Sequence, residues 1–333
     1  MSDRFSTVEI VRAAAKAARC VAAIISVLAI ICAIPAASAA QTCKPTRARP
    51  VITLKSMGPC AFDLDTLSFA GEPTQQAMCL LRGFDKSRNL APMLTNLPPV
   101  LAERLGRSSA VPARETLSAL LSKLDLEREF AANLWQPVSR ARDNDPTAPL
   151  ARYFVIHDTS GPNFGGRAFP ADIDVNPKLN NLQPFWCADG WATSHVVINR
   201  IGGMLVTHDF QIPWRETKFE RAARFAGALK GLFLHVELIQ PRRRAPGHGR
   251  RNDAQAPTPG FTPAQYDRLA LLYVIASVRA GAWLIPAFHA PIDGDIRGGH
   301  DDPQSFELDD FARSLEKLIA RLQTEQPAVS YVP

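Results

Sequence analysis

The order of strand-like and helix-like runs in the second half of the chain constrains the fold most. Residues 151–157 and 231–239 are apolar runs of strand length. Two shorter runs, 195–198 and 204–207, flank a Gly-Gly pair and predict a hairpin. Helical patterns follow these runs. Strands that alternate with helices predict an α/β fold with a mixed central β-sheet flanked by helices.

The clearest helix signal begins at Thr262. This residue is a good cap, Pro263 suits the first helical position, and Gln265 stands three residues after the cap. The apolar residues that follow cover most of the helix surface; they are Leu269, Leu271, Leu272, Val274, Ile275 and Val278. A helix that is apolar nearly all round is buried, so we expect this one to lie against the sheet. An amphipathic helix over 308–322 should pack from one side only.

The first 40 residues have the layout of a secretory signal peptide. Arg12, Lys16 and Arg19 precede an apolar run over 21–34, and small residues follow. The run is short for a membrane span. We therefore expect cleavage, export to the periplasm and no stable membrane span afterwards; an uncleaved anchor is the main alternative.

Four cysteines remain after cleavage of residues 1–40, at Cys43, Cys60, Cys79 and Cys187. An even number in an exported protein favours disulfides over a thiol site. Three pairings are possible, and we favour Cys60–Cys79 with Cys43 reaching Cys187. None has the spacing of a cysteine zinc site.

The charge balance is mildly basic. The chain has 38 Lys and Arg against 32 Asp and Glu, a net charge of +6. Cleavage removes four basic and two acidic residues and leaves +4. A positive balance suits an anionic polymer such as a cell wall, although an ordinary solubilising surface explains it equally well. Nucleic acid is not expected as a partner, because the arginine-rich stretch 241–260 has no interleaved aromatic residues. We expect a monomer.

Residues 41–145 are predicted to form a small, mainly helical, disulfide-containing N-terminal domain of unknown role. Within it, helices are expected at 74–82 and 114–134. The segment 143–149 is charged and rich in turn residues, so we place the domain boundary there. Residues 146–333 then form the second domain.

Candidate metal ligands stand at strand ends. His157 closes the strand 151–157, His289 closes a second apolar run, and Asp301 and Asp302 follow a glycine-rich turn. Two histidines and one aspartate from separate strand ends make a three-ligand zinc site with a coordination position left for hydrolysis. A single histidine at a strand end is most often only a polar terminus, so the hypothesis depends on the combination.

An amide hydrolase also needs a base and a donor for the oxyanion. Glu237 lies in an apolar strand whose alternation places Phe233, His235 and Glu237 on one face. A carboxylate there is costly unless it is paired or functional, so Glu237 is either the base or part of a salt bridge. His300, two residues before Asp302, is either the oxyanion donor or a plain surface histidine.

Several segments occur in an order that resembles one family. They are 151–159, 194–198, 234–238, 261–266 and the tail from His289 to Asp302-Pro303. Together they resemble the zinc-dependent N-acetylmuramoyl-L-alanine amidases of the amidase type 2 class, which share their fold with bacteriophage T7-type lysozyme and the peptidoglycan recognition proteins. The resemblance covers about 146–325, a little over half of the chain.

The resemblance implies a zinc ion held by His157, His289 and Asp302, with Glu237 on the central strand as the base. His300 stands where the family usually has a lysine; a histidine can donate to an oxyanion, but its charge at pH 7 depends on its surroundings. The spacing between His289 and Asp302 is longer than usual, so Asp301 remains a rival ligand.

The activity implied is hydrolysis, by zinc-activated water, of the amide between the lactyl group of N-acetylmuramic acid and L-alanine. The partner would be peptidoglycan or muropeptides. His195 is expected either to line the substrate cleft or to be a packed structural histidine. Two other hypotheses are a non-catalytic peptidoglycan-binding protein on the same fold and an envelope scaffold that acts through its N-terminal domain. The presence of all three candidate ligands favours the enzyme.

Overall fold

The structure, a computed structural model, describes residues 60–84, 90–106, 110–126, 133–182, 194–244, 254–294, 296 and 299–325. All of them belong to one compact unit, Cys43–Pro333. The predicted signal peptide and the predicted Cys43–Cys187 pair lie outside the described residues.

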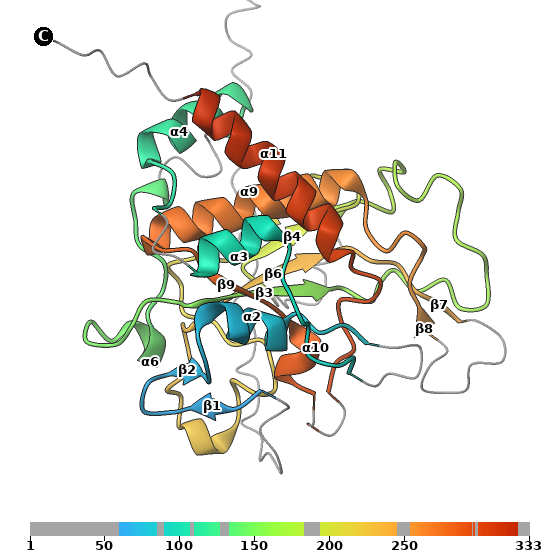
Figure 1. Cartoon of the computed structure of the whole chain (residues 1–333). Coiled ribbons are helices and arrows are strands. Elements are labelled where there is room, and N and C mark those ends of the chain that lie inside the picture. Colours follow the sequence, from blue (N-terminus) through green and yellow to red (C-terminus); the bar gives the residue numbers. More distant parts are fainter. Residues whose placement is uncertain are drawn as a thin grey trace, which may run out of the picture. The chain divides into compact units, whose positions relative to one another are not determined.

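Helices and strands alternate along the described part of the chain (Figure 1). The helices are α2 Pro73–Leu80, α3 Pro99–Gly106, α4 Arg114–Lys123, α6 Ala141–Asn144, α9 Pro263–Ala280, α10 His289–Ile292 and α11 Leu308–Thr324, with a 3₁₀ turn η1 at Ala223–Phe225. The strands are β1 Phe62–Asp63, β2 Ser68–Phe69, β3 Tyr153–Asp158, β4 Val196–Ile198, β5 Met204–Val206, β6 Phe233–Leu238, β7 Arg243–Arg244, β8 Ala254–Gln255 and β9 Ile285–Phe288.

A five-stranded sheet forms the centre, in the order β5-β4-β6-β3-β9. The β4–β5 pair is antiparallel, as the predicted hairpin requires. The β4–β6, β6–β3 and β3–β9 pairs are parallel. The prediction of an α/β fold with a mixed central sheet and flanking helices is therefore confirmed.

The two faces of the sheet are covered by different parts of the chain. Phe154 points toward α9, where its ring lies 5.4 Å from that of Tyr273. Tyr153 points the other way, with its ring 5.1 Å from that of Phe69 and 5.0 Å from that of Phe233. Helix α9 thus packs on one face, with α11 over it, and the segment from β1 to α2 packs on the other (Figure 1).

Helix α9 begins where its capping residues predict. The hydroxyl of Thr262 accepts the backbone N–H of Gln265 at 3.2 Å, and the Gln265 side chain accepts the N–H of Thr262 at 3.1 Å. Gly281 ends the helix with φ 74°, a backbone conformation that glycine adopts without strain. The predicted capping box and the burial of this helix are both confirmed.

Helix α4 ends earlier than the predicted 114–134. Asp125 has φ 55°, and its N–H donates to the carbonyl of Ser122 at 3.1 Å. The N–H of Leu126 donates to the carbonyl of Leu121 at 2.9 Å. These two bonds form a Schellman turn, which satisfies the last carbonyls and stops the helix. The apolar spacing alone did not reveal this stop.

The first described residues are tied to the sheet. The hydroxyl of Tyr153, on β3, accepts the N–H of Phe69 at 2.8 Å and donates to the side chain of Gln76 at 2.8 Å. The ring of Phe69 also stacks on that of Phe219 at 5.7 Å. Packing is therefore continuous across the predicted domain boundary near residue 145.

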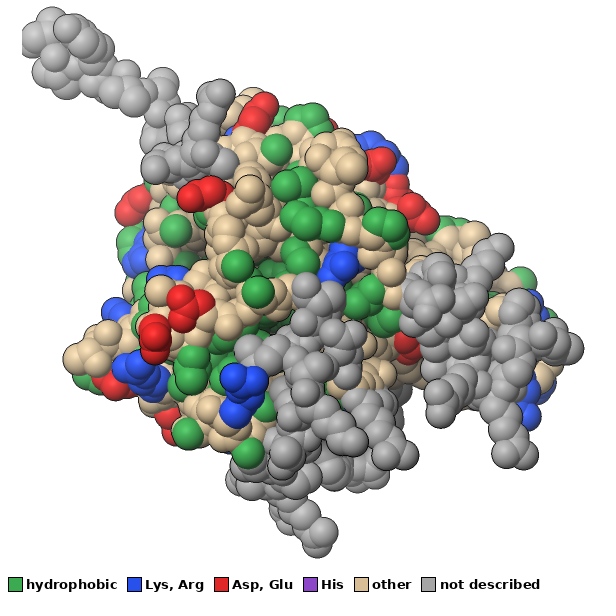
Figure 2. Space-filling model, turned by 60° about the horizontal axis from the view of Figure 1, so that its bottom comes forward, with side chains coloured by type: hydrophobic (Ala, Val, Ile, Leu, Met, Phe, Trp, Pro, Cys, Tyr) green, Lys and Arg blue, Asp and Glu red, His purple; other side chains and the backbone are tan. Residues whose placement is uncertain are grey.

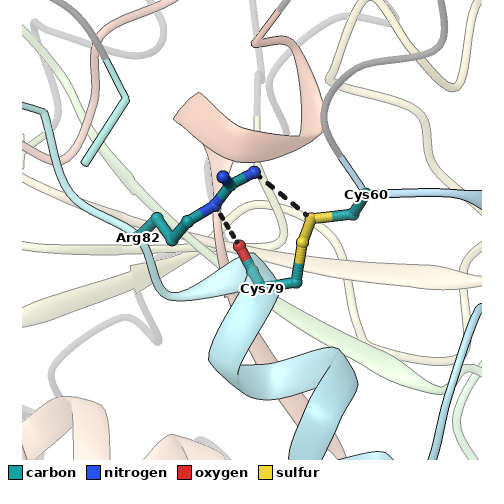
Figure 3. Close-up of a disulfide and its surroundings, with 3 residues drawn as sticks. All are labelled: Cys60, Cys79 and Arg82. Carbon is teal, nitrogen blue, oxygen red and sulfur yellow. Dashed lines mark hydrogen bonds between the residues drawn. A yellow bond between two sulfur atoms is a disulfide. The ribbon is translucent and has the colours of Figure 1, made fainter. Parts of the chain in front are cut away.

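The disulfide Cys60–Cys79 joins the start of the described chain to α2, which confirms that predicted pair. Arg82 lies over this bond (Figure 3). Its Nε donates to the Cys79 carbonyl at 3.0 Å, and a terminal nitrogen lies 3.8 Å from Sγ of Cys60. The bond therefore holds the segment that covers the Tyr153 face of the sheet.

On the face that Figure 2 shows, charged side chains of both signs are scattered among apolar ones without a large patch of a single sign. In the part of the chain that the structure describes, no helix combines the length and apolar character needed to cross a membrane.

A fragment of residues 146–333 should fail to fold cooperatively, because it lacks the segment that covers Tyr153 and Phe233. Denaturant unfolding followed by near-ultraviolet circular dichroism tests this, with residues 43–333 as the control. Cooperative unfolding of the shorter fragment would support a domain boundary near residue 145 instead.

Replacing both Cys60 and Cys79 with alanine should lower the free energy of unfolding by about 3 kcal/mol, because the bond closes a loop with a separation of 19 residues. Denaturant titration measures the loss. Reduction of the wild-type protein should have a similar effect and should leave the variant unchanged. Equal stability of the two proteins under oxidising conditions would contradict this prediction.

Candidate metal centre

Two predicted ligands meet because of strand register. Ile156 on β3 pairs with Phe288 on β9, and the strands run parallel. The next residue on each chain is a histidine, His157 on β3 and His289 at the start of α10. Because the carboxyl ends of parallel strands meet at one edge of a sheet, the two rings are brought side by side, 4.5 Å apart.

Asp302 completes a three-residue group. Nδ1 of His157 lies 3.0 Å from Nδ1 of His289, and the nearest Asp302 oxygens lie 3.4 and 3.1 Å from these two atoms. Ligands about 2.0–2.1 Å from a tetrahedral zinc ion are about 3.3 Å from one another. Two imidazole nitrogens and one carboxylate at this spacing fit a catalytic zinc ion, which usually has three protein ligands.

The polypeptide places Asp302, rather than Asp301, in this group. The N–H of Asp158 donates to Oδ2 of Asp302 at 3.3 Å, and the Asp302 carbonyl accepts the N–H of Ala290 at 2.9 Å. Asp301 instead accepts the side-chain N–H of Gln304 at 2.8 Å.

An ion pair anchors this ligand loop. Arg242 donates to both carboxylate oxygens of Asp158 at 2.6–2.7 Å, and both side chains are buried. The same carboxylate accepts the N–H of Gln304, two residues after Asp302, at 2.9 Å. The strand that carries His157 is thus connected to the loop that carries Asp302.

A second group shares His157. Its other ring nitrogen, Nε2, lies 3.0 Å from Nδ1 of His235, and Oε2 of Glu216 lies 4.0 and 3.9 Å from those two atoms. All three residues are buried, and they too have the donor types of a metal site. The carboxylate is farther from the histidines here than in the group with Asp302.

Glu237 lies on the same face of the sheet as His157. In the parallel β3–β6 register these two residues are direct partners, and neighbouring strands are about 4.8 Å apart. The side chain is 9% exposed. The predicted base is therefore next to the first predicted ligand, with little contact with water.

His300 is the exposed member of the site. Its ring stacks on His289 at 4.4 Å, and its Nδ1 lies 3.4 Å from Oδ1 of Asp302. The side chain is 55% exposed. It thus contacts two predicted ligands from the solvent side, and its role as oxyanion donor stays a prediction.

His195 is fully buried and both of its ring nitrogens contact the backbone. Nδ1 accepts the N–H of His235 at 3.0 Å, and Nε2 lies 3.1 Å from the carbonyl of Ile212. These contacts favour the packed alternative for His195, and contact with substrate stays a prediction.

Charge interactions differ among the ligands. Burial and the positive charge on His289 lower the pKa of His157 to about 3. Burial opposes a charge on His289, but the carboxylates of Asp302 and Asp293 raise its pKa well above the ordinary value. Burial would raise the pKa of Asp302, but the charge on His289 and three histidine contacts hold it well below the usual range. His157 is therefore a neutral imidazole with one free ring nitrogen, and Asp302 is ionised at neutral pH, as a metal requires.

Three acidic residues near the ligands were not predicted from the sequence. Asp293 lies 2.9 Å from Nε2 of His289 and caps the short helix α10; its position four residues after His289 was the one available signal. Glu216 and Glu220 come from an irregular segment before η1, where no periodic pattern points to a site.

No protein-family model matches the chain, and no match was found among curated proteins or solved structures. Function is therefore inferred from the chemistry of the site together with the sequence resemblance.

Zinc and protons should compete at His289. Because the pKa of His289 is higher in the folded protein than its unfolded value of 6.5, protonation of His289 stabilises the fold. This stabilisation is fully present below pH 6.5 and is lost as the pH rises through the folded-state pKa. The metal-free protein should therefore lose stability above pH 6.5, and saturating zinc should offset the loss by replacing the proton.

Denaturant unfolding of chelator-treated protein across this pH range, with and without zinc, measures the effect. His289→Gln should flatten the dependence of the metal-free protein on pH. A metal-free wild-type protein whose stability rises above pH 6.5 would contradict the assignment of charge to His289.

Proposed function

We propose that the protein is a zinc-dependent N-acetylmuramoyl-L-alanine amidase, which hydrolyses the amide between the lactyl group of N-acetylmuramic acid and L-alanine. The observation that carries the proposal is the buried group of His157, His289 and Asp302 at one sheet edge, with Glu237 beside it. A zinc ion held by these residues would polarise the scissile carbonyl and lower the pKa of a water molecule.

Glu237 would act as the general base. A carboxylate that is 9% exposed and next to a ligand histidine can take a proton from water and return it to the leaving amine. Glu237 lies on the central strand β6, which limits its movement. A fixed position suits a general base, because the proton must be taken up and returned at the same place.

His300 would stabilise the oxyanion. The ring is held by stacking on His289 while the side chain is 55% exposed, so a ring nitrogen can donate to a bound substrate. Nδ1 of His300 lies 3.4 Å from Oδ1 of Asp302, which helps to hold the ring beside the ligands.

Export to the periplasm belongs to the same proposal. The Cys60–Cys79 bond supports an oxidising compartment, where peptidoglycan is found in bacteria with an outer membrane. Substrate identity depends on the family resemblance, and purified peptidoglycan with mass spectrometry of the released stem peptides tests it. Release of intact stem peptides with a free L-alanine amine is the expected result.

Changes at the ligands should remove both zinc and activity. We expect His157→Ala, His289→Ala and Asp302→Asn to lose stoichiometric zinc by elemental analysis and to release no stem peptides. Asp301→Asn is the matched control and should keep both. Full activity in any of the three ligand variants, or a loss of zinc only in the Asp301 variant, would contradict the assignment.

Glu237→Gln should keep zinc but lower turnover by roughly 10²–10⁴-fold, as expected for a general base. The measurement is the initial rate of stem-peptide release beside the zinc content of the same sample. A decrease of less than tenfold would exclude Glu237 as the base. Zinc binding with no turnover in the wild-type protein would favour the non-catalytic peptidoglycan-binding alternative.

A further inference from the structure

Each ligand histidine faces the candidate zinc position with the same atom. Nδ1 of His157 and Nδ1 of His289 lie 3.0 Å apart beside Asp302. A neutral imidazole has one nitrogen with a proton and one with a free lone pair. If Nδ1 binds the metal, the proton of each ring must be on Nε2, and each Nε2–H needs an acceptor because both rings are buried.

For His289 the acceptor is direct. Its Nε2 lies 2.9 Å from Oδ2 of Asp293, and that carboxylate also accepts the backbone N–H groups of Phe219 at 3.0 Å and Lys218 at 3.2 Å. All of these partners donate, so Asp293 requires a proton on the histidine nitrogen that faces it. This is the usual arrangement of a metal-binding histidine with a carboxylate behind it.

For His157 the acceptor is another histidine. Its Nε2 lies 3.0 Å from Nδ1 of His235, and Nε2 of His235 lies 3.2–3.3 Å from the two oxygens of Glu220. His235 and Glu220 are both 0% exposed. Each contact joins two side chains away from water, so one proton must be on each bond.

Glu220 sets the direction of this chain. Its Oε2 accepts the N–H and hydroxyl of Thr217 at 3.0 and 2.9 Å, and the N–H of Glu216 at 3.2 Å. Burial raises the pKa of Glu220 to about 7. When this carboxyl is ionised it can only accept, so His235 donates to Glu220 from Nε2 and accepts from His157 at Nδ1. The opposite direction would place a proton on Nδ1 of His157 and block that atom as a ligand.

We propose that His235 and Glu220 are positioning residues that hold the proton of His157 on Nε2 and thereby keep its Nδ1 free for zinc. The inference rests on the proposed zinc site and does not depend on the substrate. His235 and Glu220 together thus do for His157 what the single carboxylate of Asp293 does for His289.

The rival use of the same atoms is an ion held by His157, His235 and Glu216. That ion would need Nε2 of His157 as a ligand, so it would remove the hydrogen bond to His235. The two arrangements therefore differ in which nitrogen of His157 carries the proton when zinc is bound.

The test uses zinc alone as the ligand of the purified protein. His235→Leu removes the acceptor for His157, and we expect zinc affinity to fall roughly 10–100-fold in competition titrations with a chromophoric chelator. His235→Gln can accept from His157 and donate to Glu220, so it should restore affinity to within about threefold of wild type. Ser277→Ala, a buried change on α9 away from these residues, is the control and should not weaken zinc binding.

Glu220→Gln is a second variant that tests the same inference if His235→Leu does not fold. A glutamine amide can donate to His235 and so permits the blocked direction, which should lower zinc affinity while thermal unfolding stays cooperative. A nitrogen-15 spectrum of the imidazole rings in the zinc-loaded wild-type protein should find the proton of His157 on Nε2.

Wild-type affinity in both His235→Leu and Glu220→Gln would overturn the inference, as would zinc bound to Nε2 of His157. A wild-type protein that binds no zinc would overturn the inference and the proposed metal site together. Zinc binding with the predicted pattern of variants, but no release of stem peptides, would support the positioning role of His235 and Glu220 and count against the proposed substrate.

Discussion

Parallel pairing of β3 with its two neighbours is the constraint on which the candidate site depends. One partner, β9, brings His289 beside His157, and the other partner, β6, brings Glu237 beside the same residue. A shift of one residue in either register would turn the affected side chain to the α9 face of the sheet. The core, in which the Tyr153 ring lies between those of Phe69 and Phe233, fixes this register. The geometry of the site therefore depends on the packing of the core.

Burial makes the polar groups of the site depend on one another. His157, His289 and Asp302 are all 1–2% exposed, and an unpaired polar or charged group at such depth is costly. The structure meets this cost with hydrogen bonds that continue outward, from His289 to Asp293 and from His157 to His235. Such networks hold ligands in one orientation, which a metal site needs and an apolar core would not supply.

Local signals in the sequence predicted the local parts of this arrangement. The capping residues placed the start of α9, and alternation placed His235 and Glu237 on one face of β6. Histidines at strand ends pointed to the metal group, although the choice between Asp301 and Asp302 depends on the conformation of their loop, which spacing does not encode. Glu216 and Glu220 could not be found in this way, because long-range packing brings an irregular segment against His235. The early end of α4 was missed for a related reason, since Asp125 adopts a left-handed conformation that apolar spacing does not reveal.

The most direct test of the proposed metal centre is the position of zinc in a crystal of the zinc-loaded protein, located by anomalous diffraction at the zinc edge. We predict one strong peak about 2.0–2.2 Å from Nδ1 of His157, Nδ1 of His289 and a carboxylate oxygen of Asp302. A peak between His157, His235 and Glu216, or no peak within reach of His289 and Asp302, would contradict the proposed site.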